Sequence, residues 1–420
     1  MRVVRLANFV TPVSGGVRTA LERLAGEYRT LGVDPVLVVP GPHDARHEGP
    51  GGTVLTLASP RLPGTDYHVL VDRARVRRTV RRLAPDAVEV HDRFTLPWVV
   101  GWLRRHRVPT LLMVHERLRT PLRAFAHLPS AAADVAEARA NRRLVDDVGP
   151  VVVASAHVAR TFPTGAATVV PLGVDRTTFP PRSMRREDGT LRLALVGRLS
   201  TEKDPLLAVD TATVLAGRGH DVRLDVVGTG PLARRVARRA PWSRTTLHGH
   251  LSQDEVARVV RDADVLLAPC PTEAFGLAAL EALASGVPVV GHRDGAVPEL
   301  LALPGPDPAA GLRAPTSDPS PHRRPPHVGP AGAVADGSAR DMAAAVEALL
   351  AVPEARRRAA AVARAAAHPW SASAAGLLRL LGAAPGTSTP AEDRAGSAEA
   401  RPSAARAARG PATVPALVRR

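Results

Sequence analysis

The chain has 420 residues, 45% of them hydrophobic, which is enough for two domains with full cores. Lys and Arg outnumber Asp and Glu by 56 to 40 and give a net charge of +16, but aromatic residues are only 3%, which argues against a nucleic-acid-binding protein. No apolar run reaches the length of a membrane-spanning helix, and a single cysteine, Cys270, excludes an intrachain disulfide.

The N-terminus runs directly into an apolar strand pattern, so we expect no signal peptide and a cytoplasmic protein. The basic surplus has two readings. It is almost entirely arginine, since Lys203 is the only lysine, and this suggests a compositional background. It also suits contact with an anionic membrane at the inner face of the cell.

Strand-like and helix-like segments alternate along the first 180 residues. Helical periodicity is seen at residues 17–31, 69–83 and 132–148. The predicted strands are residues 3–9, 35–39, 87–90, 110–114 and 151–154. Such alternation predicts a parallel sheet with helices on both faces, and therefore a Rossmann-like domain over residues 1–180.

A Pro-rich segment at residues 180–183, followed by charged residues to 189, predicts a linker. The alternation then restarts and predicts a second Rossmann-like domain over residues 190–345. Its predicted strands are residues 191–196, 222–227, 245–247, 265–268 and 287–290. The fold class is therefore α/β, with two doubly wound domains that face a cleft.

Three further segments complete the predicted organisation. Residues 303–330 are rich in Pro and Gly and predict a mobile insertion. Residues 346–383 contain helical periodicity, and we expect these C-terminal helices to return to the first domain. Residues 384–420 lack an amphipathic period and predict a disordered tail.

The most informative motif is the run from Glu273 to Glu281, Glu-Ala-Phe-Gly-Leu-Ala-Ala-Leu-Glu. It follows a buried-strand pattern and leads into a helix, so that Glu273 is expected on the loop and Glu281 on the helix. Anions bind at such a helix start because its free N–H groups point outward. Two carboxylates beside an anion-binding helix start suit a ligand with phosphate and hydroxyl groups, such as a nucleotide sugar.

Five motifs together resemble the retaining nucleotide-sugar glycosyltransferases of family four, which have two Rossmann-like domains (the GT-B fold). They are Ser14-Gly15-Gly16 and residues 170–175, 197–203, 227–231 and 273–281. Residues 89–96 and 115–118 resemble, more narrowly, the actinobacterial GDP-mannose-dependent α-mannosyltransferases. The resemblance implies transfer of a sugar, with mannose from GDP-mannose expected, to a glycolipid or glycan acceptor of the cell envelope. Another nucleotide sugar stays open as an alternative.

The resemblance also implies catalytic residues. Arg198 and Lys203 would hold the diphosphate and stabilise it as a leaving group, because a diphosphate in a cleft needs cations. Glu273 would contact hydroxyls of the donor sugar. His115, which follows a predicted strand, would lie close to that sugar.

The resemblance further implies a set of donor-binding residues. Glu281 would accept hydrogen bonds from the ribose hydroxyls, a geometry suited to a vicinal diol. The remaining expected donor-binding residues are Gly15, Gly16, Gly228, Gly230, Phe275, Gly276 and Leu277. His91 and Asp92 end another predicted strand and are candidates for the acceptor side. We expect neither a metal nor a cofactor, since fixed cations already neutralise the phosphates.

Two other functions were weighed. The pattern from Gly228 to Ala233 imitates a dinucleotide fingerprint and would fit a dinucleotide-dependent oxidoreductase, but its strand is not the first of its domain. A catalytically silent nucleotide-binding protein is the third possibility.

Residues 97–105 place two tryptophans beside arginines, and residues 73–82 form an arginine-rich helix pattern. These segments fit either a membrane interface or ordinary helix packing.

Overall fold

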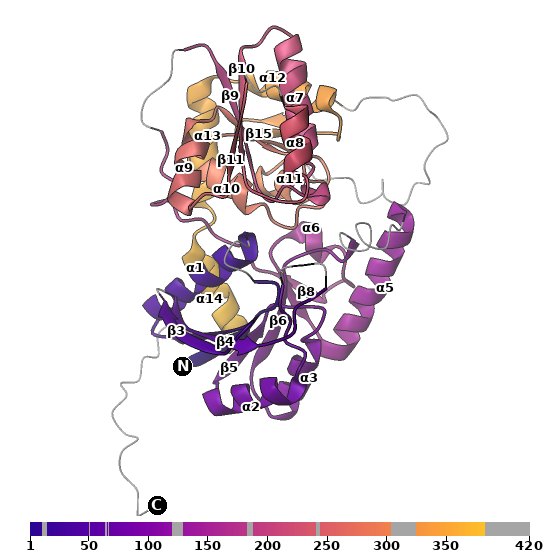
Figure 1. Ribbon diagram of the computed structural model, residues 1–420, viewed down its shortest axis with the longest axis vertical. Coiled ribbons are helices and arrows are strands. Elements are labelled where there is room, and N and C mark those ends of the chain that lie inside the picture. Colours follow the sequence, from indigo (N-terminus) through magenta and orange to yellow (C-terminus); the bar gives the residue numbers. More distant parts are fainter. Residues whose placement is uncertain are drawn as a thin grey trace, which may run out of the picture. The chain divides into compact units, whose positions relative to one another are not determined.

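The fold is that of a computed structural model, which describes residues 1–10, 15–49, 51–63, 65, 67–119, 129–182, 188–240, 244–303 and 325–382 (Figure 1). All of these residues belong to one compact unit. Ser14, most of the predicted insertion at 303–330 and the predicted disordered tail lie outside the described residues.

The first half of the chain forms one sheet. Its strands are β1 (Arg2–Leu6), β2 (Asp34–Gly41), β3 (Ala45–Gly49), β4 (Gly52–Ala58), β5 (Ala87–Val90), β6 (Thr110–Val114), β7 (Val151–Val153) and β8 (Ala167–Val169). Among the described residues they run in the order β3-β4-β2-β1-β5-β6-β7-β8. Neighbours are parallel except at the edge, where β3 pairs antiparallel with β4.

Helices cover this sheet. They are α1 (Gly16–Thr30), α2 (Arg73–Leu83), α3 (Pro97–Arg105), α5 (Ser130–Val148) and α6 (Ala156–Ala159). On α1, Leu21, Leu24 and Tyr28 recur at helical spacing and are buried, which directs this face of α1 toward β2 and β4. On the other side, α3 packs against β5, β6 and α5.

The second half forms another sheet. Its strands are β9 (Leu191–Val196), β10 (Val222–Val227), β11 (Thr245–Gly249), β12 (Val265–Ala268), β13 (Val289–His292), β14 (His327–Gly329) and β15 (Gly332–Ala335). The described strands run in the order β11-β10-β9-β12-β13-β15-β14, and only β14 is antiparallel to its neighbour.

Helices cover both faces of the second sheet. They are α7 (Pro205–Gly217), α8 (Ala233–Arg239), α9 (Gln253–Asp262), α10 (Leu277–Ala284), α11 (Val297–Leu300), α12 (Ala339–Leu350) and α13 (Glu354–Ala366). The side chains of β9 alternate between the two faces of the sheet, as successive side chains of any strand do. Leu193 and Leu195 join the core under α7 and α12, whereas Ala194 joins the core under α9 and α10.

The last described helix, α14 (Trp370–Leu380), packs against α1 of the first half (Figure 1). Ser373 Oγ donates a hydrogen bond to the carbonyl oxygen of Pro171 at 2.6 Å. Gly173 lies directly against this helix start, since a Cβ at Gly173 would stand 2.3 Å from the backbone nitrogen of Trp370. The glycine is therefore needed for the close approach of two backbones.

Several element boundaries differ from the sequence predictions. The helix predicted from residue 69 begins at Arg73, because the Asp72 side chain accepts a hydrogen bond from the Arg75 N–H and caps the helix there. The strand predicted at 287–290 is β13, which begins two residues later. Strands β3, β4, β8, β14 and β15 were not predicted, and β14 lies inside the segment predicted to be a mobile insertion.

We predict that Gly173→Ala lowers the free energy of unfolding by about 2–3 kcal/mol, because the added methyl group collides with backbone that has no room to move. Urea unfolding measures this loss. Gly217→Ala is the control, since a Cβ added at Gly217 would meet no packing neighbour within 4 Å, and this variant should be neutral or slightly stabilising. Equal stability of Gly173→Ala and the wild type would contradict the packing described here.

Candidate active site

A pocket of about 400 Å³ is lined by residues of both halves. Its walls come from the carboxyl ends of parallel strands, where ligands of open α/β sheets bind. Nine of the residues predicted from the sequence line it: Gly15, Gly16, His115, Arg198, Lys203, Glu273, Phe275, Gly276 and Leu277. His91 and Asp92 line it as well.

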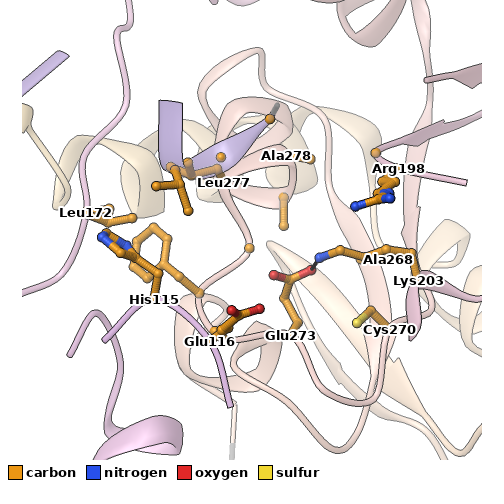
Figure 2. A pocket seen from close by; sticks show the side chains of 18 of the residues that line it. His115, Glu116, Leu172, Arg198, Lys203, Ala268, Cys270, Glu273, Leu277 and Ala278 are labelled. Carbon is orange, nitrogen blue, oxygen red and sulfur yellow. Dashed lines mark hydrogen bonds and ion pairs between the residues drawn. The ribbon is translucent and has the colours of Figure 1, made fainter. Parts of the chain in front are cut away.

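Lys203 and Glu273 form an ion pair in the pocket, with Lys203 Nζ 2.7 Å from Glu273 Oε2 (Figure 2). Lys203 ends the short helical turn that follows β9, and Glu273 lies on the loop between β12 and α10. Burial opposes the charge on Lys203, but Glu273, together with Cys270 and Glu202, outweighs this effect and raises the pKa of the ammonium. Lys203 is therefore a permanent cation beside a carboxylate.

Arg198 adds a second cation from the loop after β9. Its side chain is exposed, and Nη1 donates to Tyr67 Oη of the first half at 3.3 Å. In Figure 2, Arg198 and Lys203 lie toward one side of the pocket and His115 toward the other. The pocket thus has a cationic end that can hold an anionic group.

The start of α10 forms another wall. Its N-cap residue, Gly276, has a φ of 96°, a left-handed conformation that favours glycine. The first N–H groups of α10 have no partner within the helix, as at every helix start, and the helix dipole adds positive potential there. Gly16 of the first half approaches this wall, because a Cβ at Gly16 would lie 3.3 Å from Leu277 Cδ1.

His115 follows β6 and contacts a second histidine. His91 Nδ1 and His115 Nε2 are 2.9 Å apart, and the two rings are inclined by only 18°. Burial lowers the pKa of His115 to about 3, and the nearby His91 and Arg5 add to this effect. His115 is therefore neutral at physiological pH.

Three predicted donor-binding residues do not line this pocket. Gly228 and Gly230 lie where the loop after β10 crosses the loop after β9. A Cβ at Gly228 would stand 1.9 Å from the carbonyl oxygen of Gly197, and one at Gly230 would stand 2.5 Å from that of Leu199. These two glycines therefore hold the loop that carries Arg198.

Glu281 is the third of these residues. It lies on α10, partly buried, and burial raises the pKa of its carboxyl to about 8, although Arg23 offsets part of that effect. Its assignment to the ribose stays a prediction.

The structure adds pocket residues that the sequence reasoning missed. Phe9 contacts both Tyr67 and Phe94 edge to face, and all three rings line the pocket. Glu116 also lines the pocket. Burial against the pocket walls raises the pKa of its carboxyl, although the nearby Arg93 opposes this effect. Glu116 directly follows His115 at a strand end, so position alone could have indicated it, whereas nothing in the sequence marks Tyr67.

The described ranges contain no group of three or more His, Cys, Asp or Glu side chains arranged to hold a metal ion. No helix among the described residues is long and apolar enough to cross a membrane.

The pocket joins a cationic end, a helix start and carboxylate and histidine side chains between two Rossmann-like halves, and comparison with known proteins identifies the class of this protein. Residues 190–321 match the family described as glycosyl transferases group 1, and residues 15–198 match the glycosyl transferase 4-like domain. The chain belongs to this family of glycosyltransferases. The oxidoreductase alternative is therefore wrong, and the glycines that suggested it are explained by loop packing.

The chain is 38% identical over 397 residues to a GDP-mannose-dependent alpha-(1-6)-phosphatidylinositol dimannoside mannosyltransferase of Mycobacterium tuberculosis. That match covers 91% of this chain and 96% of the relative. A D-inositol 3-phosphate glycosyltransferase of Mycolicibacterium gilvum is 30% identical, over about half of each chain (50% and 52%).

Solved structures share the fold. Sucrose-phosphate synthase from Thermosynechococcus elongatus superposes with a TM-score of 0.68 at 18% identity, covering 90% of this chain and 98% of its own. The glycosyltransferase WaaG, involved in lipopolysaccharide biosynthesis, has a TM-score of 0.59, with 90% and 99% coverage at 14% identity. These likenesses confirm the predicted two-domain GT-B fold.

We predict that Glu281→Gln stabilises the free protein increasingly as pH rises from 5 to 8. The folded-state pKa of about 8 lies above the ordinary 4.5, so the folded protein retains a proton that the unfolded chain loses, and ionisation favours unfolding across this window. Glutamine cannot ionise, and the gain at pH 8 should be ~1–3 kcal/mol after allowance for partial exposure. Urea unfolding at pH 5 and pH 8 measures it.

Glu22→Gln, on an exposed part of α1, controls for the loss of a carboxylate. A stability difference between wild type and Glu281→Gln that does not grow with pH would contradict the prediction.

Proposed function

We propose that this glycosyltransferase transfers mannose from GDP-mannose to a phosphatidylinositol mannoside or similar glycolipid, with retention of configuration. The observation that carries the proposal is the near full-length relationship to a mannosyltransferase whose name specifies this donor and acceptor. The pocket supports it, because its cations, helix start and carboxylates suit the diphosphate and hydroxyl groups of a nucleotide sugar.

On the donor side, the diphosphate would lie between Arg198, Lys203 and the start of α10. Lys203 is partly buried and paired with Glu273 at 2.7 Å, so a phosphate oxygen entering the pocket would share the ammonium with that carboxylate. The second oxygen of Glu273 would then accept a hydrogen bond from a sugar hydroxyl. These fixed charges stabilise negative charge as it develops on the leaving diphosphate.

The bond changes proposed are a same-face substitution. The bond between the anomeric carbon and the phosphate oxygen breaks, and the acceptor hydroxyl oxygen bonds to that carbon on the same face. The acceptor proton passes to the departing phosphate oxygen. We propose that no metal or cofactor takes part, with Arg198 and Lys203 in the role of counter-charges.

On the acceptor side, the two residues predicted from the sequence, His91 and Asp92, both form hydrogen bonds within the protein. Asp92 accepts hydrogen bonds from the Asn8 side chain and from the Thr95 hydroxyl and N–H, so it organises the loop after β5. The Glu116 carboxylate has no hydrogen-bond partner among the described residues, and it opens to the pocket. We propose that Glu116 accepts a hydrogen bond from a hydroxyl of the acceptor.

The decisive assay incubates the purified enzyme with GDP-mannose, UDP-glucose or UDP-N-acetylglucosamine and a phosphatidylinositol mannoside. We expect a product heavier by one hexose with GDP-mannose alone, and an α-linkage by NMR. Turnover with a uridine donor only would overturn the proposed donor, and a β-linkage would overturn retention.

The Lys203→Ala variant shows whether the product is made by this enzyme or by a contaminating activity. Loss of a preorganised charge-stabilising group should lower kcat by roughly 10²–10³-fold. The matched control is Arg235→Ala, which removes an exposed cation of the same half on α8, away from the pocket, and should leave kcat unchanged.

We also propose peripheral contact with an anionic membrane through the exposed arginines of α2. The tryptophans considered for this role do not form the contact surface. Trp102 is 5% exposed, and the guanidinium of Arg77 lies over both rings, 5.3 Å from the centre of Trp98 and 5.7 Å from that of Trp102. The structure therefore favours helix packing for the tryptophans and leaves Arg78 and Arg82 exposed on α2.

Co-sedimentation with anionic and neutral vesicles tests this contact. Arg78→Glu/Arg82→Glu should weaken binding to anionic vesicles by about tenfold or more, since each arginine near the surface contributes about 1 kcal/mol. Arg235→Glu/Arg238→Glu on α8 changes the net charge equally and should bind as the wild type does. Equal loss in both variants would reduce the effect to net charge and contradict a specific surface.

A further inference from the structure

A chain of hydrogen bonds leads from the interior of the first half to His115. It begins at Glu89, the third residue of β5, whose side chain is fully buried. Arg5 on the adjacent β1 donates from Nε to Glu89 Oε2 at 2.8 Å. Tyr28 on α1 donates from Oη to Glu89 Oε1.

The hydrogen-bond donors around Glu89 determine the protonation state of its carboxyl group. Arginine has only N–H groups and cannot accept, and its second donor is also used, since Arg5 Nη1 bonds the carbonyl oxygen of Leu21 at 2.6 Å. Burial raises the pKa of Glu89, but Arg5 and the hydrogen bonds from His91 and Tyr28 bring it down to about 2. Glu89 is therefore a carboxylate, which can only accept.

This carboxylate sets the tautomer of His91. His91 Nε2 is 3.0 Å from Glu89 Oε2, so Nε2 must carry a hydrogen. Burial lowers the pKa of His91, although Glu89 opposes this, and the ring is neutral. A neutral imidazole with hydrogen on Nε2 has a lone pair on Nδ1.

The lone pair of His91 in turn sets the tautomer of His115. The two facing nitrogens are 2.9 Å apart, the ring centres are 5.1 Å apart and the planes nearly coincide, so the rings meet edge to edge in one N–H···N hydrogen bond. His115 Nε2 must donate to His91 Nδ1. The remaining nitrogen of His115, Nδ1, is then an acceptor, and no group among the described residues bonds to it.

We propose that Glu89 is a positioning residue for sugar transfer: acting through His91, it holds His115 as the tautomer with hydrogen on Nε2, so that His115 Nδ1 accepts a hydrogen bond from a donor-sugar hydroxyl. The proposal rests on the donor site proposed above. Which nitrogen of a histidine carries the proton is set by the partner of the other nitrogen, and here that partner is traced back to an arginine that cannot reverse it.

A consequence follows for the sugar. A hydroxyl can donate a hydrogen bond to His115 Nδ1. A carboxylate at the same position has no hydrogen to donate, so its oxygen lone pairs would repel the lone pair of Nδ1. The arrangement therefore selects a neutral sugar over a uronic acid with its carboxylate at that position.

The first test is ¹⁵N NMR of the histidine rings in the wild-type protein without donor at pH 7, with His115→Asn used only for assignment. We expect the chemical shift of a protonated nitrogen at Nε2 and of an unprotonated nitrogen at Nδ1. The reverse pattern, or a doubly protonated ring, would overturn the proposal. The measurement needs no donor, so it stands or falls independently of whether GDP-mannose is the substrate.

Two variants then distinguish whether Glu89 and His91 orient His115 or only stabilise the fold. His91→Phe keeps the ring but offers no acceptor, so His115 should lose its fixed tautomer, and kcat/KM should fall about 10- to 100-fold, the effect of one lost hydrogen bond in a buried site. Glu89→Gln should keep the tautomer, since its amide oxygen can accept from Arg5 and His91 while the NH₂ faces Tyr28. It should keep most of the activity per folded molecule, although the buried charge of Arg5 is then uncompensated and the fold is less stable.

Donor analogues that each lack one sugar hydroxyl complete the test. With the wild type, one analogue should react about 10-fold or more slowly than the full sugar because its contact to His115 is missing. With His91→Phe, that same analogue and the full sugar should react at similar rates. A penalty that persists unchanged in His91→Phe, or a wild-type pattern of shifts in that variant, would show that His91 only supports the fold.

Discussion

The ion pair between Arg5 and Glu89 is the constraint on which the first half depends. Neither side chain is exposed, and the two strands that carry them are neighbours at the centre of the sheet. Removing one partner of such a pair leaves an uncompensated buried charge at a cost of about 3–5 kcal/mol. Tyr28 and His91 satisfy the remaining acceptor capacity of Glu89, and so a charge required by the core also orients side chains at the pocket.

The two halves of the site are built on different principles. On the first side, the histidines are held by buried partners that no ligand can displace. On the second side, Lys203 and Glu273 are 35% and 20% exposed, and each can exchange part of its pairing for a ligand atom. A rigid wall thus faces a wall of exchangeable charges, an arrangement that suits the proposed reaction, in which charge develops on the leaving group.

Much of this architecture was predictable from the sequence. Mostly buried central strands, such as residues 191–196 and 265–268, are predominantly apolar in sequence and were predicted with their exact bounds. The edge strand β3 is exposed along most of its length and has no such pattern. The cations Arg198 and Lys203 were predicted from motifs that resemble a known glycosyltransferase family, and the helix start from the sequence pattern between residues 265 and 281. Glu89 could not be found in this way, since an acid inside an apolar run reveals nothing of the arginine opposite it.

Because α14 returns to the first half, the chain crosses between the two halves twice. The first half is completed by a helix near the end of the described chain, and so the second half is in effect an insertion within it, joined by two crossings near residues 175 and 369. Any motion between the halves must therefore involve both crossings, which lie side by side at the bridge between Val174 and Pro369. An exchange of second halves between relatives would accordingly need two junctions, and a chimera cut only at the first would separate α1 from the helix that packs against it.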